Sequence, residues 1–242
     1  MEAISGFLDI YRPLRSSRDA PDRDFVNELS LLHVDLDYPD RLDYPRNAAR
    51  RAMEIMLIGL VLFLGTHSIS IVNAPWRDKV AARLGEFSWQ AIYAVFAVAG
   101  FVLIVWGYGL ARQAPEVLYV PPVWLRHVAL LLMLLVFPLL LAAYLPGRIK
   151  SATRHPMLLA TKIWALAHLL ANGMLHDVVL FGAFLAWAVV DRISMKRRVQ
   201  RPVPGAPPSK YNDVIAVVGG LGLYVWFVLQ GHAWLFGVSP VG

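Results

Sequence analysis

The stretch MEIMLIGLVLFLGTHSISIV, residues 53–72, is the clearest indication of the fold class of this chain. Its only ionisable side chains are Glu54 and His67, and the residues between them are almost all apolar. About 20 predominantly apolar residues are needed for a helix to cross the hydrocarbon core of a bilayer. The stretch therefore predicts a transmembrane helix that carries His67 close to its middle.

Five further stretches are apolar enough to span a membrane: residues 91–111, 127–145, 156–172, 175–190 and 214–236. The 242-residue chain is 57% hydrophobic and 17% charged, and its mean hydropathy is +0.52. Such a composition is too apolar for a soluble domain of this size. We predict an all-α integral membrane protein with about six transmembrane helices in a bundle, of which the fifth is the shortest.

Several function classes are excluded by residues that the sequence lacks. It has no cysteine, so disulfides, iron–sulfur clusters, thiolate catalysis and covalently attached haem are ruled out. It also lacks an H-E-x-x-H metalloprotease motif, a Gly-x-Ser-x-Gly nucleophile elbow and a P-loop. A hydrolase or a nucleotide-driven pump is therefore not indicated.

The basic residues indicate an orientation in the membrane rather than a nucleic-acid partner. Only Arg112 and Arg126 lie in the connection after the second stretch, and none lies after the fourth or the sixth. By the positive-inside rule, the side richer in Lys and Arg is cytoplasmic, so the C-terminus is expected outside. The connections on that richer side hold Arg77, Lys79, Arg83, Arg148, Lys150, Arg154, Arg192, Lys196, Arg197, Arg198, Arg201 and Lys210.

The remaining segments differ in character from this membrane domain. Residues 1–52 are polar and rich in arginine, and they contain no apolar stretch typical of a signal peptide. We expect them to be disordered, or to precede a natural start at Met53 or Met56, and the alternative is a genuine N-terminal extension. Residues 199–213 predict a proline-rich linker, and residues 214–242 a final transmembrane helix with a short tail.

His67 and His168 are the candidate metal ligands. Each lies within a stretch apolar enough to be membrane-embedded, where an ionisable side chain is costly unless it has a partner or a function. Two neutral imidazoles on different helices can hold one metal between them, and haem iron suits such a pair. The alternative is that both histidines only make hydrogen bonds between helices.

The surroundings of His168 also suit a cofactor. Trp164 and Asn172 lie at helical spacing from it, and Trp164 could pack on a macrocycle. Arg126, Arg154 and Lys162 are candidate partners for anionic propionates. The other histidines of the membrane domain, His127, His155, His176 and His232, are expected near the ends of spans or at the surface.

Long stretches of residues 53–198 resemble the NnrU family. These stretches are GLVLFLGTHS (59–68), LIVWGYGLAR (103–112), PPVWLRHVALLLMLLVFPLLLAAYLPGRIK (121–150), RHPMLLATKIWALAHLLANG (154–173) and LFGAFLAWAVVDRISMKRR (180–198). The resemblance implies an inner-membrane protein, because bacterial members are linked to denitrification. Plant relatives are 15-cis-ζ-carotene isomerases that carry haem b between two histidines.

The resemblance extends to the two histidines. The ALAH sequence at 165–168 is similar to the plant CLAH motif and implies His168 as a ligand, and THS at 66–68 implies His67. Ala165 stands where the plant enzymes have cysteine, so an exchange of iron ligands here would need another histidine or a five-coordinate iron.

We therefore expect a b-type haem protein that supports nitrogen-oxide metabolism and has nitric oxide as a candidate ligand. One alternative is a haem-dependent 15-cis-ζ-carotene cis–trans isomerase acting on a carotenoid. The other is a haem-free membrane assembly factor in which the histidines are only structural. All three place the protein in the lipid bilayer.

Overall fold

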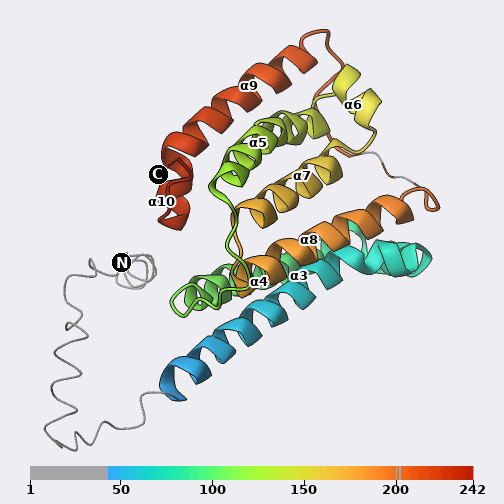
Figure 1. The fold of residues 1–242 in the computed structure, drawn as a ribbon. Helices are drawn as coiled ribbons and strands as arrows, with labels where there is room; N and C mark the ends of the chain where they lie inside the picture. The colour runs from blue at the N-terminus through green and yellow to red at the C-terminus, as the bar shows by residue number, and fades with distance from the viewer. Residues whose placement is uncertain (1–42, 200, 202, 242) are drawn as a thin grey trace, which may run out of the picture.

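The computed structural model describes residues 43–199, 201 and 203–241, and most of these residues are helical (Figure 1). The elements, labelled as in Figure 1, are α3 (Asp43–Leu84), α4 (Glu86–Ala111), α5 (Val123–Tyr144), α6 (Arg148–Thr153), α7 (Pro156–Ala171), α8 (Leu175–Ser194), α9 (Asn212–Trp226), the π-helix η2 (Phe227–Gly231) and α10 (His232–Phe236). Residues 43–52, which we expected to be irregular, form the first turns of α3. The rest of the predicted leader lies outside the described residues.

All six apolar stretches are helical, but the count of six membrane spans is not confirmed. Among the described residues, four helices are long and apolar enough to cross a membrane: Asn47–Leu84, Glu86–Ala111, Val123–Tyr144 and Asn212–Phe236. The 16 residues of α7 extend only about 24 Å at 1.5 Å per residue, which is short of a core about 30 Å thick. The remaining stretch, α8, carries Asp177, Asp191 and Arg192.

The main contacts between the helices follow one another in a row. α4 packs on α3, α3 on α8, α8 on α7, α7 on α5, and α5 on α9 (Figure 1). Two buried clusters fill the row. One joins Met56, Leu60 and Ile104 to Ala165 and Phe181, and the other joins α5 to α7. α7 and α8 therefore lie in the middle of the row, with a helix packed on either side of each.

Glycines let neighbouring helix backbones approach closely. A Cβ atom on Gly107 of α4 would lie 2.4 Å from the Met56 nitrogen of α3, and one on Gly59 would lie 2.6 Å from the Ile104 nitrogen. A Cβ on Gly220 of α9 would lie 2.4 Å from the nitrogen of Pro138 in α5. Small residues at such crossings are typical of helix packing in membranes, where dispersion contacts replace the hydrophobic effect.

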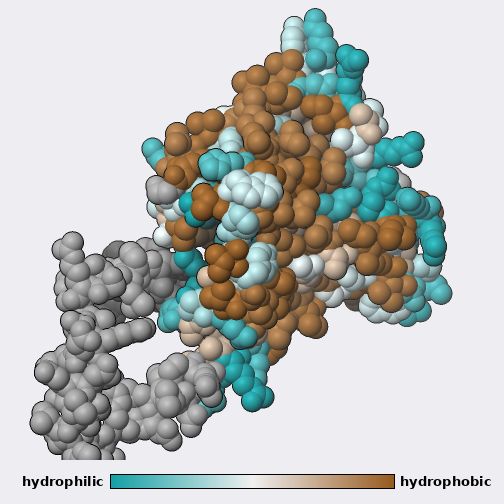
Figure 2. Space-filling model, in the orientation of Figure 1, coloured by the Kyte–Doolittle hydropathy of each residue, from teal (hydrophilic) through white to brown (hydrophobic). Residues whose placement is uncertain are grey.

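The outer faces of the helices are apolar. Val61, Val95, Leu131 and Val218, from four different helices, are each more than 60% exposed. Figure 2 shows hydrophobic residues over most of the visible face, with hydrophilic residues gathered toward its margins. An apolar exterior of this kind is compatible with a surrounding lipid bilayer.

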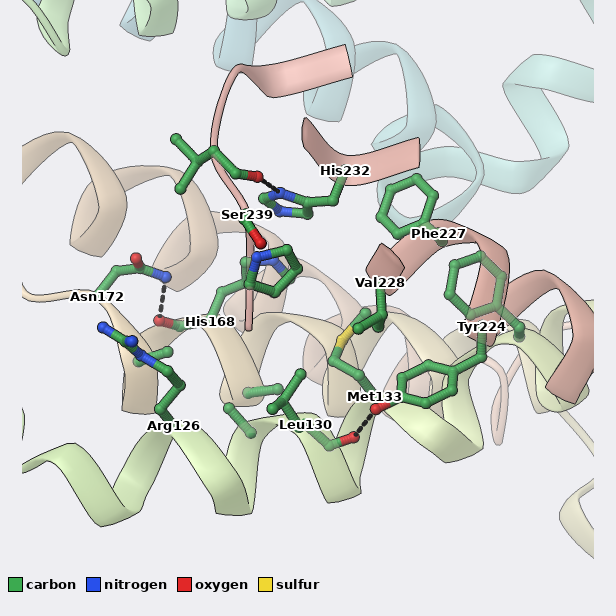
Figure 3. A pocket seen from close by; sticks show the side chains of 16 residues that line it. Arg126, Leu130, Met133, His168, Asn172, Tyr224, Phe227, Val228, His232 and Ser239 are labelled. Atoms are coloured by element: carbon green, nitrogen blue, oxygen red, sulfur yellow. Dashed lines mark hydrogen bonds between the residues drawn. The ribbon is translucent and has the colours of Figure 1, made fainter. Parts of the chain in front are cut away.

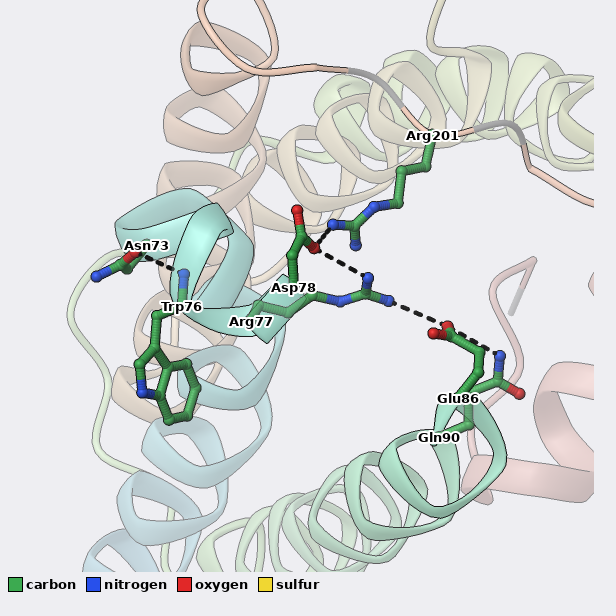
Figure 4. A network of polar contacts seen from close by, with 7 residues as sticks. All are labelled: Asn73, Trp76, Arg77, Asp78, Glu86, Gln90 and Arg201. Carbon is green, nitrogen blue, oxygen red and sulfur yellow. Dashed lines mark hydrogen bonds and ion pairs between the residues drawn. The ribbon is translucent and has the colours of Figure 1, made fainter. Parts of the chain in front are cut away.

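One end of the molecule is formed by the kink of α3 and by the linker before α9. Asn73 has non-helical backbone angles, and its Oδ1 accepts a hydrogen bond from the Trp76 backbone N–H at 2.9 Å, which starts a second helical leg (Figure 4). Asp78 of this leg pairs with Arg77 and with Arg201 of the linker (Figure 4).

The opposite end is formed by the α4–α5 loop and by the turn between α7 and α8. The Leu118 N–H donates to the Gly173 carbonyl at 2.9 Å, and the Leu175 N–H donates to the Glu116 carbonyl at 2.8 Å. The last turn of α10 belongs to the same end, because the Arg112 guanidinium donates to its Phe236 carbonyl at 2.7 Å.

Candidate functional site

His168 is held in one orientation near the end of α7. Its Nδ1 lies 2.8 Å from the Trp164 carbonyl oxygen one turn earlier. A carbonyl can only accept, so Nδ1 carries the proton and Nε2 keeps its lone pair. Phe181 of α8 stacks on the imidazole with ring centroids 4.4 Å apart. The ring thus has both the tautomer and the restraint typical of a metal-binding histidine.

This imidazole lines a cavity of about 170 Å³ between α5, α7 and the end of α9 (Figure 3). The walls are largely apolar, and Arg126 from the first turn of α5 brings a permanent positive charge to them. The Asn172 amide donates to the His168 carbonyl at 3.0 Å, and the Tyr224 hydroxyl donates to the Leu130 carbonyl at 3.0 Å. Both of these polar groups therefore support the backbone around the cavity.

His67 lines a different cavity. Its Nδ1 donates to the Phe63 carbonyl at 2.7 Å, so its Nε2 also keeps a lone pair. The cavity measures about 300 Å³ and is lined by Thr66, His67, Ile69, Ser70, Arg77, Trp89, Gln90 and Tyr93. His67 precedes the kink of α3 by six residues, whereas His168 precedes the last residue of α7 by three, at the opposite end of the molecule.

Aromatic rings occupy the space between the two histidines. Phe63 lies 4.2 Å from His67 and 5.8 Å from Phe184, measured between ring centroids. Phe184 in turn lies 5.4 Å from Trp164, which lies 5.3 Å from His168. Trp164, which we expected to pack on a cofactor, thus belongs to this aromatic layer and does not line the His168 cavity. The structure does not bring His67 and His168 together.

Of the predicted site residues, His168, Arg126 and Asn172 share one cavity. Arg154 lies at the other end of α7, where it ends α6 with φ 60°. Lys162 lies on α7 but lines neither histidine cavity. The end of α7 therefore supplies His168 and Asn172 to this cavity, and the start of α5 supplies Arg126.

Sequence reasoning missed His232, which lines the same cavity as His168. It lies in the last predicted span, and we had placed it near the external face with no role. Its approach to His168 depends on how α9 and α10 pack on α5, which no local spacing reveals. Sequence reasoning also missed Tyr224 of α9, which lines the cavity and donates a hydrogen bond to the Leu130 carbonyl of α5.

The donor set fits a haem better than a bare metal ion. Within the described part of the chain, no group of three or more His, Asp or Glu side chains is placed to hold a metal. A haem brings four nitrogen ligands of its own and needs only axial imidazole, apolar walls and a cation for its carboxylates. The cavity is smaller than the roughly 300–1,000 Å³ of common ligand pockets, so it would enclose only part of a haem.

A family model described as NnrU protein matches residues 55–240. The chain belongs to the NnrU family. The NnrU match continues beyond residue 198, where the resemblance read from the sequence ended, and takes in the linker, α9 and α10. Both histidine cavities and His232 therefore lie within the NnrU region. No curated protein and no solved structure matches the chain.

Proposed function

We propose that this NnrU-family protein is an inner-membrane b-type haem protein that uses His168 as an iron ligand and supports nitrogen-oxide metabolism. The observation that carries the proposal is the setting of His168. Its Nδ1 donates a proton to the Trp164 carbonyl, Phe181 stacks on its face, and the imidazole lines a largely apolar cavity with Arg126 in the wall.

This setting is costly unless the imidazole has a function. A polar ring surrounded by apolar side chains loses solvation, and metal coordination by Nε2 would compensate for that loss. Arg126 would pair with a haem carboxylate, since guanidinium–carboxylate pairs are strong and geometrically specific. When bound, the haem would supply an iron centre able to exchange electrons or to bind a small ligand such as nitric oxide.

The proposal includes six membrane-crossing segments, a cytoplasmic basic side and an external C-terminus. α7 and α8 lie in the middle of the helix row, so the neighbouring helices cover much of their surface. Their charged ends therefore contact protein more than lipid, and short helices can be accommodated there. For example, the Asp177 carboxylate of α8 accepts a hydrogen bond from the Tyr108 hydroxyl of α4 at 2.6 Å. Under the positive-inside rule, Arg126 and the His168 cavity that it lines would lie toward the external side.

The test is a reduced-minus-oxidised visible spectrum of detergent-purified protein, combined with a pyridine haemochromogen assay. We expect a b-type spectrum and about one haem per chain. His168→Ala should lose the haem, whereas His127→Ala, at an exposed position in the first turns of α5, should keep it. A colourless, folded protein from a haem-replete host would contradict the proposal and favour the haem-free assembly factor.

A further inference from the structure

The last membrane helix contains a π-turn just before His232. Residues Phe227–Gly231 form η2, and the His232 backbone N–H donates to the Phe227 carbonyl five residues earlier. π-turns are rare and occur frequently at functional sites, because one extra residue in a turn changes which side chains face a neighbouring helix. In α10, His232 is the side chain that lines the cavity shared with His168.

The imidazole of His232 is restrained in the same way as that of His168. Its Nδ1 donates to the Val238 carbonyl at 2.6 Å, which leaves the lone pair on Nε2. The chain can return to this position because Gly237 has a φ of 69°, in the left-handed region that glycine tolerates. The rings of Phe227 and Phe236 pack on His232 with centroids 5.7 Å and 5.0 Å away.

The two imidazoles reach one cavity from different helices. Figure 3 shows both side chains among those that line the cavity. Metal-ligating histidines commonly donate their second nitrogen to a carbonyl, and both of these do so. His67, by contrast, lies behind the aromatic layer in the other cavity.

We infer that His232 is the second axial ligand, so that His168 and His232, rather than His67 and His168, hold the haem. This inference rests on the proposed haem binding through His168. Two other side chains in the cavity belong to residue types that ligate haem iron, Met133 and Tyr224. The Tyr224 hydroxyl already donates to the Leu130 carbonyl at 3.0 Å, so Met133 is the alternative that the experiment tests.

The experiment compares the spin state and haem content of four proteins: the wild type, His232→Ala, His67→Ala and Met133→Leu. Absorption and electron paramagnetic resonance spectra are recorded at equal haem concentration. We expect the wild type, His67→Ala and Met133→Leu to be low-spin and six-coordinate. His232→Ala should keep His168-bound haem but become high-spin, and added imidazole should restore the low-spin spectrum because it fills the vacated position.

The possible failures are distinguishable. A haem-free wild type would overturn the proposed function and this inference with it. A wild type with haem, combined with an unchanged low-spin spectrum in His232→Ala, would overturn this inference alone. Conversion to high spin in His67→Ala or Met133→Leu would also overturn it. Where His232→Ala does not fold, His232→Met decides, since a thioether ligand in place of imidazole should shift the reduction potential and the low-spin spectrum.

Discussion

Phe181 of α8 stacks on the imidazole of His168 in α7, with planes 23° apart. The two helices are joined by a turn of only three residues, Asn172–Met174, so the stack forms within one helical hairpin. The stack and the Nδ1 hydrogen bond to Trp164 together restrain the ring. The orientation of the proposed iron ligand therefore depends on α8 as well as on its own helix.

Replacing Phe181 with leucine should weaken haem binding without removing it. The apolar volume is largely kept, but the flat face against His168 is lost, and loss of such supporting contacts typically costs about 10- to 100-fold in metal affinity. The rate of haem transfer to apomyoglobin measures the effect. Phe184→Leu is the matched control, because Phe184 packs on Trp164 and Phe63 instead. Equal losses in both variants would show that the stack has no specific role.

Arg126→Ala should also weaken haem retention, by about tenfold, because it removes the permanent positive charge from the cavity wall. Arg126→Lys should recover part of the affinity, since the ammonium keeps the charge but not the planar pair of donors. Haem titration of the apoprotein provides the measurement. Arg83→Ala, on the exposed second leg of α3, controls for net charge. Wild-type affinity in Arg126→Ala would argue against a carboxylate partner.

Gly107→Ala should destabilise the contact between α3 and α4. The added Cβ would lie 2.4 Å from the Met56 nitrogen, and backbone atoms cannot move aside cheaply. Overpacking of this kind costs about 1–3 kcal/mol. Gly65→Ala on α3, where a Cβ meets nothing within 4 Å, should be neutral or slightly stabilising. Thermal unfolding in detergent compares the two, and similar midpoints would mean that the helices separate more easily than their packing indicates.

Stability should fall in acid partly through His155, which precedes α7. Burial lowers the pKa of His155 in the folded protein, and the positive charge of Arg192 acts in the same direction. The unfolded state then binds a proton more readily than the folded state. The neutral ring's contribution is present above an unfolded pKa of about 6.5 and is lost as the pH falls from there toward the folded pKa.

Thermal midpoints measured between about pH 5 and pH 7.5 test the role of His155. His155→Gln, which does not titrate, should show a shallower fall in stability toward acid than the wild type. The Nε2 atom of His155 is buried without a hydrogen-bond partner, so the glutamine side chain replaces no existing bond at that atom. Parallel pH profiles for the two proteins would assign the acid sensitivity to other groups.

The positions of the helices and their apolar surfaces follow from local sequence alone. Each of the six apolar stretches is helical, because length, composition and the scarcity of charge act within one segment. Pro156 begins α7, where its fixed φ and missing N–H suit the first turn. The closeness of His168 and Asn172 could also be predicted from their spacing, because residues four apart lie on one helix face.

Which histidines share a cavity depends instead on how the helices pack together. His67 and His168 each lie in an apolar stretch, but α3 and α7 are not direct neighbours in the helix row, and aromatic rings lie between the two imidazoles. The approach of His232 depends on the packing of α9 against α5 and on a π-turn. That packing joins segments about 90 residues apart, as in the hydrogen bond from Tyr224 to Leu130. Periodicity along one segment carries no information about such contacts.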